Sequence, residues 1–314
     1  MSKLIRKAVL FAKTELAYGV DALTDPVNDG LTHAILVKNV SVTPLAQDLI
    51  ARDVVTPYLG NDEQIAATTR VEISFEVEMA GAGAPGDVPA YGPLLESCAM
   101  AQLINMGVSV EYNPISDGFK SMTMIYNVDG VQHKMRGARG NVVATVDARG
   151  IPVYAFSFTG LYVDVVDQIP GAVDYSMFLK PLAANEENTP AFSLFGQDVV
   201  MQQLVLDAGN SVVYRNLVGD EKVLITDRAS VGSCQFEMTS VTEYDWFAEV
   251  KSTNTGAMSL QHGTVPGNIV ELVSNRAQIT NPSVSDSDGV AMIGFDINYI
   301  PSSAGNDEFK IIVR

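Results

Sequence analysis

Short runs of alternating hydrophobic and polar residues dominate the chain and predict β-strands. In residues 70–79, RVEISFEVEM, apolar side chains alternate with Glu or Ser, the period of two expected of a strand with one buried face. Similar runs, bounded by Gly, Asn, Asp or Pro, occur at 154–163, 212–218, 222–228, 290–300 and 309–314. The pattern predicts a mainly β protein.

Two segments depart from this pattern and predict short helices. Residues 91–104 are rich in Ala, Leu, Met and Glu, and Pro93 suits a first helical turn. Residues 242–251 contain the single tryptophan, Trp246, and begin with Thr242, a residue type that caps helices. Each half of the chain is therefore expected to contain one short helix among many strands.

An ordered set of matches predicts an internal duplication. The matches, in chain order, pair RD and GNDE (52–53, 60–63) with RN and GDE (215–216, 219–221), FEV (75–77) with FEM (236–238), QH (132–133) with QH (261–262), GN (140–141) with GN (267–268), and FTGLY (158–162) with FDINY (295–299). The alternative is that β-rich domains share turn residues by chance. The Gly-Asn pairs are interpreted as tight turns.

The duplication divides the chain into four parts. We expect an N-terminal arm at 1–30, a first domain at 31–166, a linker at 167–190 and a second domain at 191–314. The linker contains three prolines and the polar run 185–188. A length of 314 residues gives each domain enough chain to bury its own core.

The charge balance argues against nucleic-acid binding. The chain has 20 Lys and Arg against 37 Asp and Glu, a formal charge of −17. Binding through phosphates needs clustered Lys and Arg, whereas this surface would repel a polyanion. An acidic surface past which DNA slides without specific binding is compatible with this composition.

No membrane or export segment is expected. No apolar run approaches the roughly 20 residues that span a bilayer, and the apolar run at 8–12 is too short for a signal-peptide core. The two cysteines, Cys98 and Cys234, lie too far apart in sequence for a paired metal motif and are interpreted as buried residues. The protein is expected to be soluble.

A screen for chemistry predicts neither an active site nor a cofactor or metal. GAGAPG (81–86) satisfies G-x-G-x-x-G, but two prolines separate it from the predicted helix, so it is interpreted as a flexible loop. SDSDG (285–289) lacks the closing Glu of a calcium loop and is interpreted as an acidic turn. His33, His133 and His262 are too widely separated for a recognised metal motif. The protein is not expected to be an enzyme.

Several segments together resemble the tail tube (major tail) proteins of long, non-contractile-tailed bacteriophages. They are VLFAKTELAYGVD (9–21), VTPLAQDLIARDVVTPYLGNDE (42–63), RVEISFEVEMAG (70–81), YGPLLESCAMA (91–101), GARGNVV (137–143), FSFTGLY (156–162), VVYRNLVG (212–219), VLITDR (223–228) and HGTVPGNIV (262–270). The resemblance covers nearly the whole chain.

The resemblance implies two tandem tail-tube-like β-sandwich or barrel domains whose inner strands join those of neighbours around a lumen. Because relatives form sixfold rings from one domain per chain, the duplication predicts homo-trimeric, pseudo-hexameric rings; hexameric rings are the alternative. Stacked rings would form a virion tube, made in the host cytoplasm, through which DNA is ejected. The tape-measure protein in the lumen and the tail terminator and tail-tip proteins at the ends are the implied partners.

The resemblance also suggests roles for particular residues. Glu72, Glu76 and Glu78 are candidates for the lumen lining, with an outer solvated face as the alternative. Residues 41–68 and 204–224 occupy the place of a hairpin that reaches the next ring. Its candidate contact residues are Asp48, Arg52, Asp53, Tyr58, Asp62, Glu63, Arg215, Asp220 and Glu221. A soluble, adhesin-like β-sandwich binding module is the alternative function.

Overall fold

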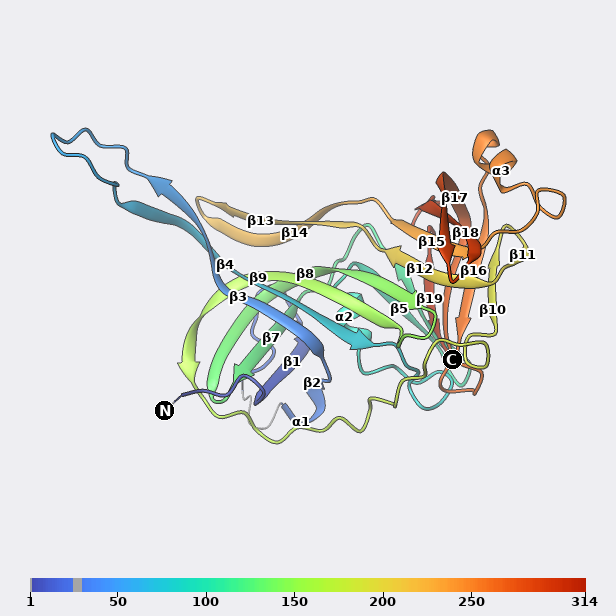
Figure 1. The fold of residues 1–314 in the computed structure, drawn as a ribbon. Coiled ribbons are helices and arrows are strands. Elements are labelled where there is room, and N and C mark those ends of the chain that lie inside the picture. The colour runs from blue at the N-terminus through green and yellow to red at the C-terminus, as the bar shows by residue number, and fades with distance from the viewer. Residues whose placement is uncertain (1, 25–29) are drawn as a thin grey trace.

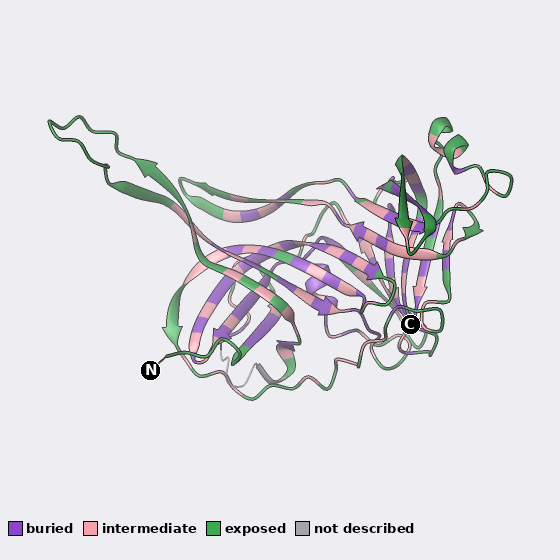
Figure 2. Ribbon diagram, viewed as in Figure 1, coloured by how far each residue is buried: buried purple, intermediate pink, exposed green. Residues whose placement is uncertain are grey.

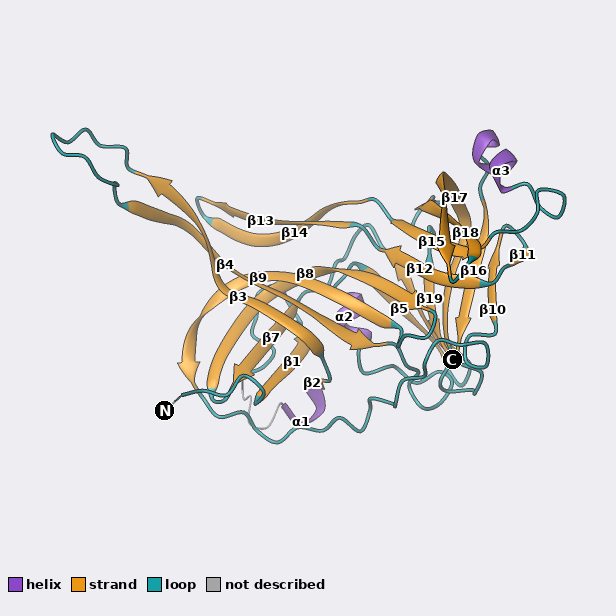
Figure 3. Ribbon diagram, in the orientation of Figure 1, coloured by secondary structure: helices purple, strands orange, loops and turns teal. Residues whose placement is uncertain are grey.

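The chain, described for residues 2–24 and 30–314 in a computed structural model, consists almost entirely of antiparallel strands (Figures 1 and 3). The first half contains β1 (Ala8–Thr14), β2 (Ala34–Ile35), β3 (Lys38–Ala51), β4 (Gln64–Glu78), β5 (Met100–Asn105), β6 (Ser109–Pro114), β7 (Met122–Val128), β8 (Val131–Asp147) and β9 (Val153–Asp167). The second half contains β10 (Ala191–Leu194), β11 (Gln197–Asp198), β12 (Met201–Asp207), β13 (Asn210–Leu217), β14 (Asp220–Arg228), β15 (Val231–Glu237), β16 (Gly256–His262), β17 (Val270–Ser287), β18 (Val290–Tyr299) and β19 (Lys310–Val313). The helices are α1 (Gly30–His33), α2 (Gly92–Glu96) and α3 (Trp246–Ser252).

The same order of strand pairing occurs in both halves. In the first half, β1 pairs with β7, β7 with β8, β8 with β9, β9 with β4 and β4 with β3. In the second half, β10, β16, β17, β18, β15 and β12 pair in the corresponding order. The long strands β8 and β17 pair with different neighbours at their two ends. The fold is mainly β with the β-sandwich architecture that the sequence predicts.

Hydrogen bonds between strands also join the two halves. β8 pairs with β12, from Asp147 opposite Gln203 to Val143 opposite Asp207. β6 pairs with β19 at the outer hairpin β5–β6. The first of these pairings produces one continuous sheet across the molecule, in the order β3-β4-β9-β8-β12-β15-β18-β17, which we call the long sheet.

Aromatic side chains occupy equivalent places in the core of each half. Val71, Ile73, Phe75 and Val77 of β4 are buried, as their alternation predicts, and Phe75 lies 6.0 Å from Phe158 between ring centroids. In the second half, Phe236 lies 5.8 Å from Phe295 and 5.0 Å from Trp246. The matched FEV/FEM and FTGLY/FDINY segments therefore hold corresponding core positions, and one buried cluster extends through both halves.

Two of the sequence matches are wrong, because the structure places their members differently. Gly140 and Asn141 lie within β8, where a Cβ on Gly140 would stand 2.4 Å from the carbonyl oxygen of Ser157. Gly267 and Asn268 instead lie in the turn before β17, with φ of +89° at Gly267. The two Gln-His pairs differ in the same way, one in β8 and one at the end of β16.

Both predicted helices, α2 and α3, are present, but their bounds differ from the prediction. α2 ends at Glu96, and residues 100–105 form β5, because pairing with β6 satisfies their backbone groups in a hairpin. α3 is capped by Asp245, not Thr242: its carboxylate accepts a hydrogen bond from the N–H of Ala248 at 2.9 Å. The additional helix α1 was not predicted.

The expected N-terminal arm is wrong over residues 8–14, because these residues form β1 within the sheet. This strand pairs with β7 along its whole length, from Ala8 opposite Val128 to Thr14 opposite Met122, and it also pairs with β2. Leu10 and Phe11 are buried in the core, because their apolar side chains require cover that an arm does not provide. Residues 1 and 25–29 of the expected arm lie outside the described residues.

The expected linker contains no helix or strand over residues 168–190 and follows the lower edge of the molecule in Figure 3. It is attached along its course. Phe178 packs against the core, and the backbone of Ala184 exchanges hydrogen bonds with Arg149 and Gly150.

The GAGAPG loop is packed against the second half, which corrects its interpretation as a flexible loop. The N–H of Gly81 donates to the side-chain oxygen of Asn268 at 2.7 Å, and the N–H of Gly83 donates to the carbonyl of Gly267 at 2.9 Å. A Cβ on Gly81 would lie 2.2 Å from that carbonyl oxygen. Glycine is thus required at this position by close backbone approach, without any ligand.

We expect Gly81→Val to destabilise the packing between the halves by on the order of 2 kcal/mol, because the new side chain would overlap backbone that cannot yield. Chemical denaturation of the purified chain would measure this loss. Gly60→Ala is the matched control, since a Cβ at Gly60 meets nothing within 4 Å. Equal stability of the two variants would contradict the proposed contact.

Candidate assembly surfaces

The long sheet has an acidic face opposite the core. Glu72, Glu76 and Glu78 project from β4 on this face, each partly exposed. Their nearest cationic partners are Arg70, whose Nε lies 2.7 Å from Glu72, and Lys38, whose Nζ lies 3.7 Å from Glu78. The ladder registers place four more carboxylates on the same face: Asp147, Asp207, Glu237 and Asp296. Carboxylates outnumber cations here, so this face carries negative charge.

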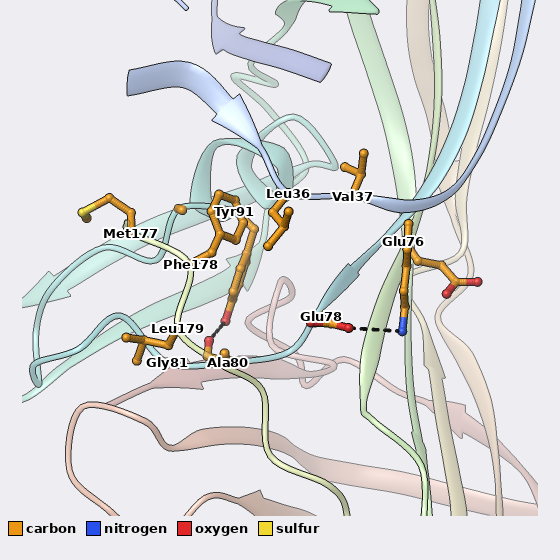
Figure 4. A pocket seen from close by; sticks show the side chains of 12 residues that line it. Leu36, Val37, Glu76, Glu78, Ala80, Gly81, Tyr91, Met177, Phe178 and Leu179 are labelled. Carbon is orange, nitrogen blue, oxygen red and sulfur yellow. Dashed lines mark hydrogen bonds and ion pairs between the residues drawn. The ribbon is translucent and has the colours of Figure 1, made fainter. Parts of the chain in front are cut away.

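A hollow of about 210 Å³ lies where β3 begins and β4 ends (Figure 4). Met177, Phe178 and Leu179 of the linker form one wall. Tyr91 donates a hydrogen bond to the carbonyl of Ala80 at 2.7 Å, and burial raises the pKa of Tyr91 well above its usual value. The hollow is mainly apolar, with carboxylates at its rim.

The internal junction between β8 and β12 shows how two halves join edge to edge. Val142 and Leu204 are buried there, at 1% and 0% exposure. On the acidic face, Gln203 donates to Asp147 and Asn141 donates to Asp207, both at 2.7 Å. Backbone pairing, apolar burial and side-chain hydrogen bonds therefore act together at this junction.

Both ends of the long sheet are open edges. Among the described residues, β3 pairs along its length only with β4, and β17 pairs over 280–287 only with β18. At the edge, Val284 stands opposite Ile293 and is 63% exposed. At the junction, Val142 stands opposite Phe156 and is buried. These two pairs correspond, because Phe156 lies two residues before Phe158 and Ile293 lies two residues before Phe295, the first residues of the matched FTGLY and FDINY segments. The exposed apolar position at the edge therefore corresponds to a buried one at the junction.

The predicted hairpin residues lie on two hairpins. β3–β4 projects beyond the body of the molecule (Figure 1), and its residues are exposed over 52–63 (Figure 2). Arg52 pairs with Glu63 at 3.0 Å, Tyr58 is 83% exposed, and Asp53 and Asp62 are also exposed. Arg215, Asp220 and Glu221 lie on the second hairpin, β13–β14.

Asp48 is part of a polar cluster on the part of the first hairpin nearest the body, residues 45–51 and 64–69, which we call the stalk. Its carboxylate accepts hydrogen bonds from the hydroxyl of Thr68 at 2.6 Å and from Arg70 at 3.2 Å. Both hydrogen bonds lower the pKa of Asp48, and the bond from Thr68 has the larger effect. They join β3 to β4 near the body.

The second hairpin is docked on the first half through residues that the sequence analysis missed. Arg139 of β8 donates to the carbonyl of Val223 at 3.0 Å, and Tyr18 accepts a hydrogen bond from the N–H of Val223 at 2.5 Å. The Arg139 guanidinium also lies 4.9 Å from the centre of the Tyr18 ring. Burial lowers the pKa of Arg139 and raises that of Tyr18.

The histidines do not converge on a site. His133 lies in β8 opposite Tyr126, whereas His262 lies at the end of β16 with its Nδ1 2.8 Å from the hydroxyl of Thr189. Within the described residues, no group of three or more His, Cys, Asp or Glu side chains could hold a metal ion. No helix in the same part of the chain is long and apolar enough to span a membrane.

Two halves with the same strand order, open sheet edges and a projecting hairpin define a mainly β architecture suited to assembly. A family model described as phage tail tube protein matches residues 5–298, and the chain belongs to that family. No curated protein matches the chain. The family confirms the resemblance seen in the sequence and gives the chain a structural role in a phage tail tube.

We expect Arg139→Gln to loosen the second hairpin. The shorter, neutral side chain loses charged hydrogen bonds to Val223 and Phe119, and a hydrogen bond to a charged group contributes about 1.5–3 kcal/mol. Amide hydrogen exchange at 220–228 should accelerate about tenfold or more. Arg149→Gln is the control, because that side chain is 88% exposed. Unchanged exchange at 220–228 would show that Arg139 does not hold the hairpin.

Proposed function

We propose that three copies of the chain form a closed ring in which the internal β8–β12 junction is repeated between chains. The open edge of β17 would pair with the open edge of β3 in the next chain. Each chain contributes two halves with corresponding strand order, so three chains supply six units. The correspondence between exposed Val284 and buried Val142 is the observation that carries this proposal.

Ring closure would remove two structural liabilities at once. Open strand edges are templates for uncontrolled pairing, and a head-to-tail ring leaves none in the long sheet. Full burial of an exposed valine contributes about 1.5–3 kcal/mol, in addition to the backbone hydrogen bonds formed. Three equal junctions of this kind favour a closed assembly over isolated chains.

The acidic face of the long sheet would then line the lumen. Glu72, Glu76 and Glu78 would repel DNA phosphates, so that DNA passes through during ejection without specific binding. In this role the protein is a virion component made in the host cytoplasm and acts without catalysis. A tape-measure protein would occupy the lumen during assembly, and tail terminator and tail-tip proteins would close the ends.

The rings would stack through the first hairpin. Its tip, residues 52–63, is exposed and includes Val55, at 101% exposure, and Leu59, at 107%. Such apolar side chains at the end of a projecting hairpin favour contact with another ring. Arg52, Asp53, Tyr58, Asp62 and Glu63 would lie at that contact, whereas Asp48, Arg215, Asp220 and Glu221 lie nearer the body or on the second hairpin.

We expect Val284→Asp to leave the chain folded but unable to close rings, because the carboxylate would be buried at the junction between chains. Circular dichroism would report folding, and negative-stain electron microscopy would report rings and tubes. Val265→Asp is the matched control: Val265 is 64% exposed but lies in the turn before β17, away from both edges. Normal rings from Val284→Asp would contradict the proposed junction.

We expect Glu72→Lys/Glu76→Lys/Glu78→Lys to slow genome ejection several-fold, because lysines in the lumen would bind DNA phosphates. The measurement is the rate of DNA release from phage particles with tails of normal length, compared at low and high salt. Added salt should partly restore the rate, since it weakens phosphate contacts. An unchanged rate at low salt would place these side chains outside the lumen.

A further inference from the structure

The position of the second hairpin indicates what covers the stalk of the first. β13–β14 leaves the second half and lies against β8 and β9 of the first half (Figure 1). β3–β4 leaves the first half toward the same side of the molecule and extends past its body. The two hairpins occupy corresponding places in their halves, but only one of them has a neighbouring half beneath it.

Burial differs accordingly between the two hairpins. Val223 of the second hairpin is 0% exposed, with Tyr214 opposite it in the ladder. Ile65, on the stalk of the first hairpin, is 56% exposed, with Ile50 opposite it at 60% exposure. The first hairpin thus presents an uncovered pair of isoleucines, whereas the second hairpin is packed against β8 and β9.

The internal contact also identifies the surface that would cover this pair. Val223 meets Arg139, which stands opposite Thr159 in the pairing of β8 with β9. In the second half, Thr280 stands opposite Asp296 in the pairing of β17 with β18. Thr159 directly follows Phe158, and Asp296 directly follows Phe295, the matched Phe residues of the two halves. Thr280 therefore occupies in the second half the position that Arg139 occupies in the first.

We propose that the stalk of the first hairpin, residues 45–51 and 64–69, lies across β17 and β18 of the adjacent chain in the same ring. The surface around Thr280 of that neighbouring chain would cover Ile50 and Ile65. The proposal rests on the ring described above and assigns the stalk to closure of the ring, whereas the tip beyond it remains available to the next ring. A single hairpin would thus serve two different contacts.

Contacts between the two hairpins support this arrangement. Tyr214 of the second hairpin donates to the carbonyl of Thr69 on the stalk of the first at 3.1 Å. The guanidinium of Arg70 lies 5.7 Å from the centre of the Tyr214 ring. Each hairpin would therefore rest on the stalk of the next, and the hairpins of three chains would form an overlapping collar around the ring.

Thiol cross-linking tests the proposal directly. In Ile65→Cys/Thr280→Cys, a short bis-maleimide should join chains within rings and give dimers and trimers on a denaturing gel, with no larger product. The native Cys98 and Cys234 are buried, at 1% and 3% exposure, and should not react. Val55→Cys/Thr280→Cys is the matched control and should give no product in isolated rings, because Val55 lies at the tip.

Absence of cross-links in rings seen by electron microscopy, or products larger than trimers, would overturn the stalk contact. Failure of the unmodified chain to form rings would instead overturn the proposed function. Two charge variants provide an independent check. Ile50→Asp/Ile65→Asp should prevent ring closure, whereas Val55→Asp/Leu59→Asp should permit rings that do not stack. Normal rings from Ile50→Asp/Ile65→Asp would refute the stalk contact.

Discussion

Backbone pairing between β8 and β12 is the interaction on which the rest of the molecule depends. It turns two β-sandwich halves into one body with a continuous long sheet. Because the pairing consumes the β8 edge of the first half and the β12 edge of the second, it leaves β3 and β17 as the outer edges. The same hydrogen bonds that unite the chain therefore determine where it remains open to another copy.

The boundary between the two halves of one chain has more contacts than the proposed boundary between two chains. Within the chain, pairing of β6 with β19, packing of the GAGAPG loop against Gly267 and docking of the second hairpin all reinforce the long sheet. The β5–β6 hairpin has no counterpart between α3 and β16 of the second half. A boundary between chains would lack that reinforcement, so proposed rings should separate into whole chains before the halves of one chain separate.

The sequence predicted the local structure well where burial imposes a period. The alternation in 70–79 identified β4 and its buried face, and the Phe positions in FEV/FEM and FTGLY/FDINY identified corresponding core sites. It failed where structure depends on partners distant in sequence. Residues 100–105 have helical composition but form β5, because β6 lies beside them. The Gly-Asn pairs share letters but not surroundings, and nothing local distinguishes a strand glycine from a turn glycine.

The assembly residues could be predicted only in part for the same reason. Projecting hairpin residues such as Tyr58 stand out by sequence position, but Tyr18 and Arg139 acquire meaning only when folding brings Val223 to them. The mass of an isolated ring, measured by native mass spectrometry, gives the number of chains that it contains. We expect three times the 33.7 kDa chain mass. A ring of six chains, or a protein that stays monomeric at high concentration, would contradict it.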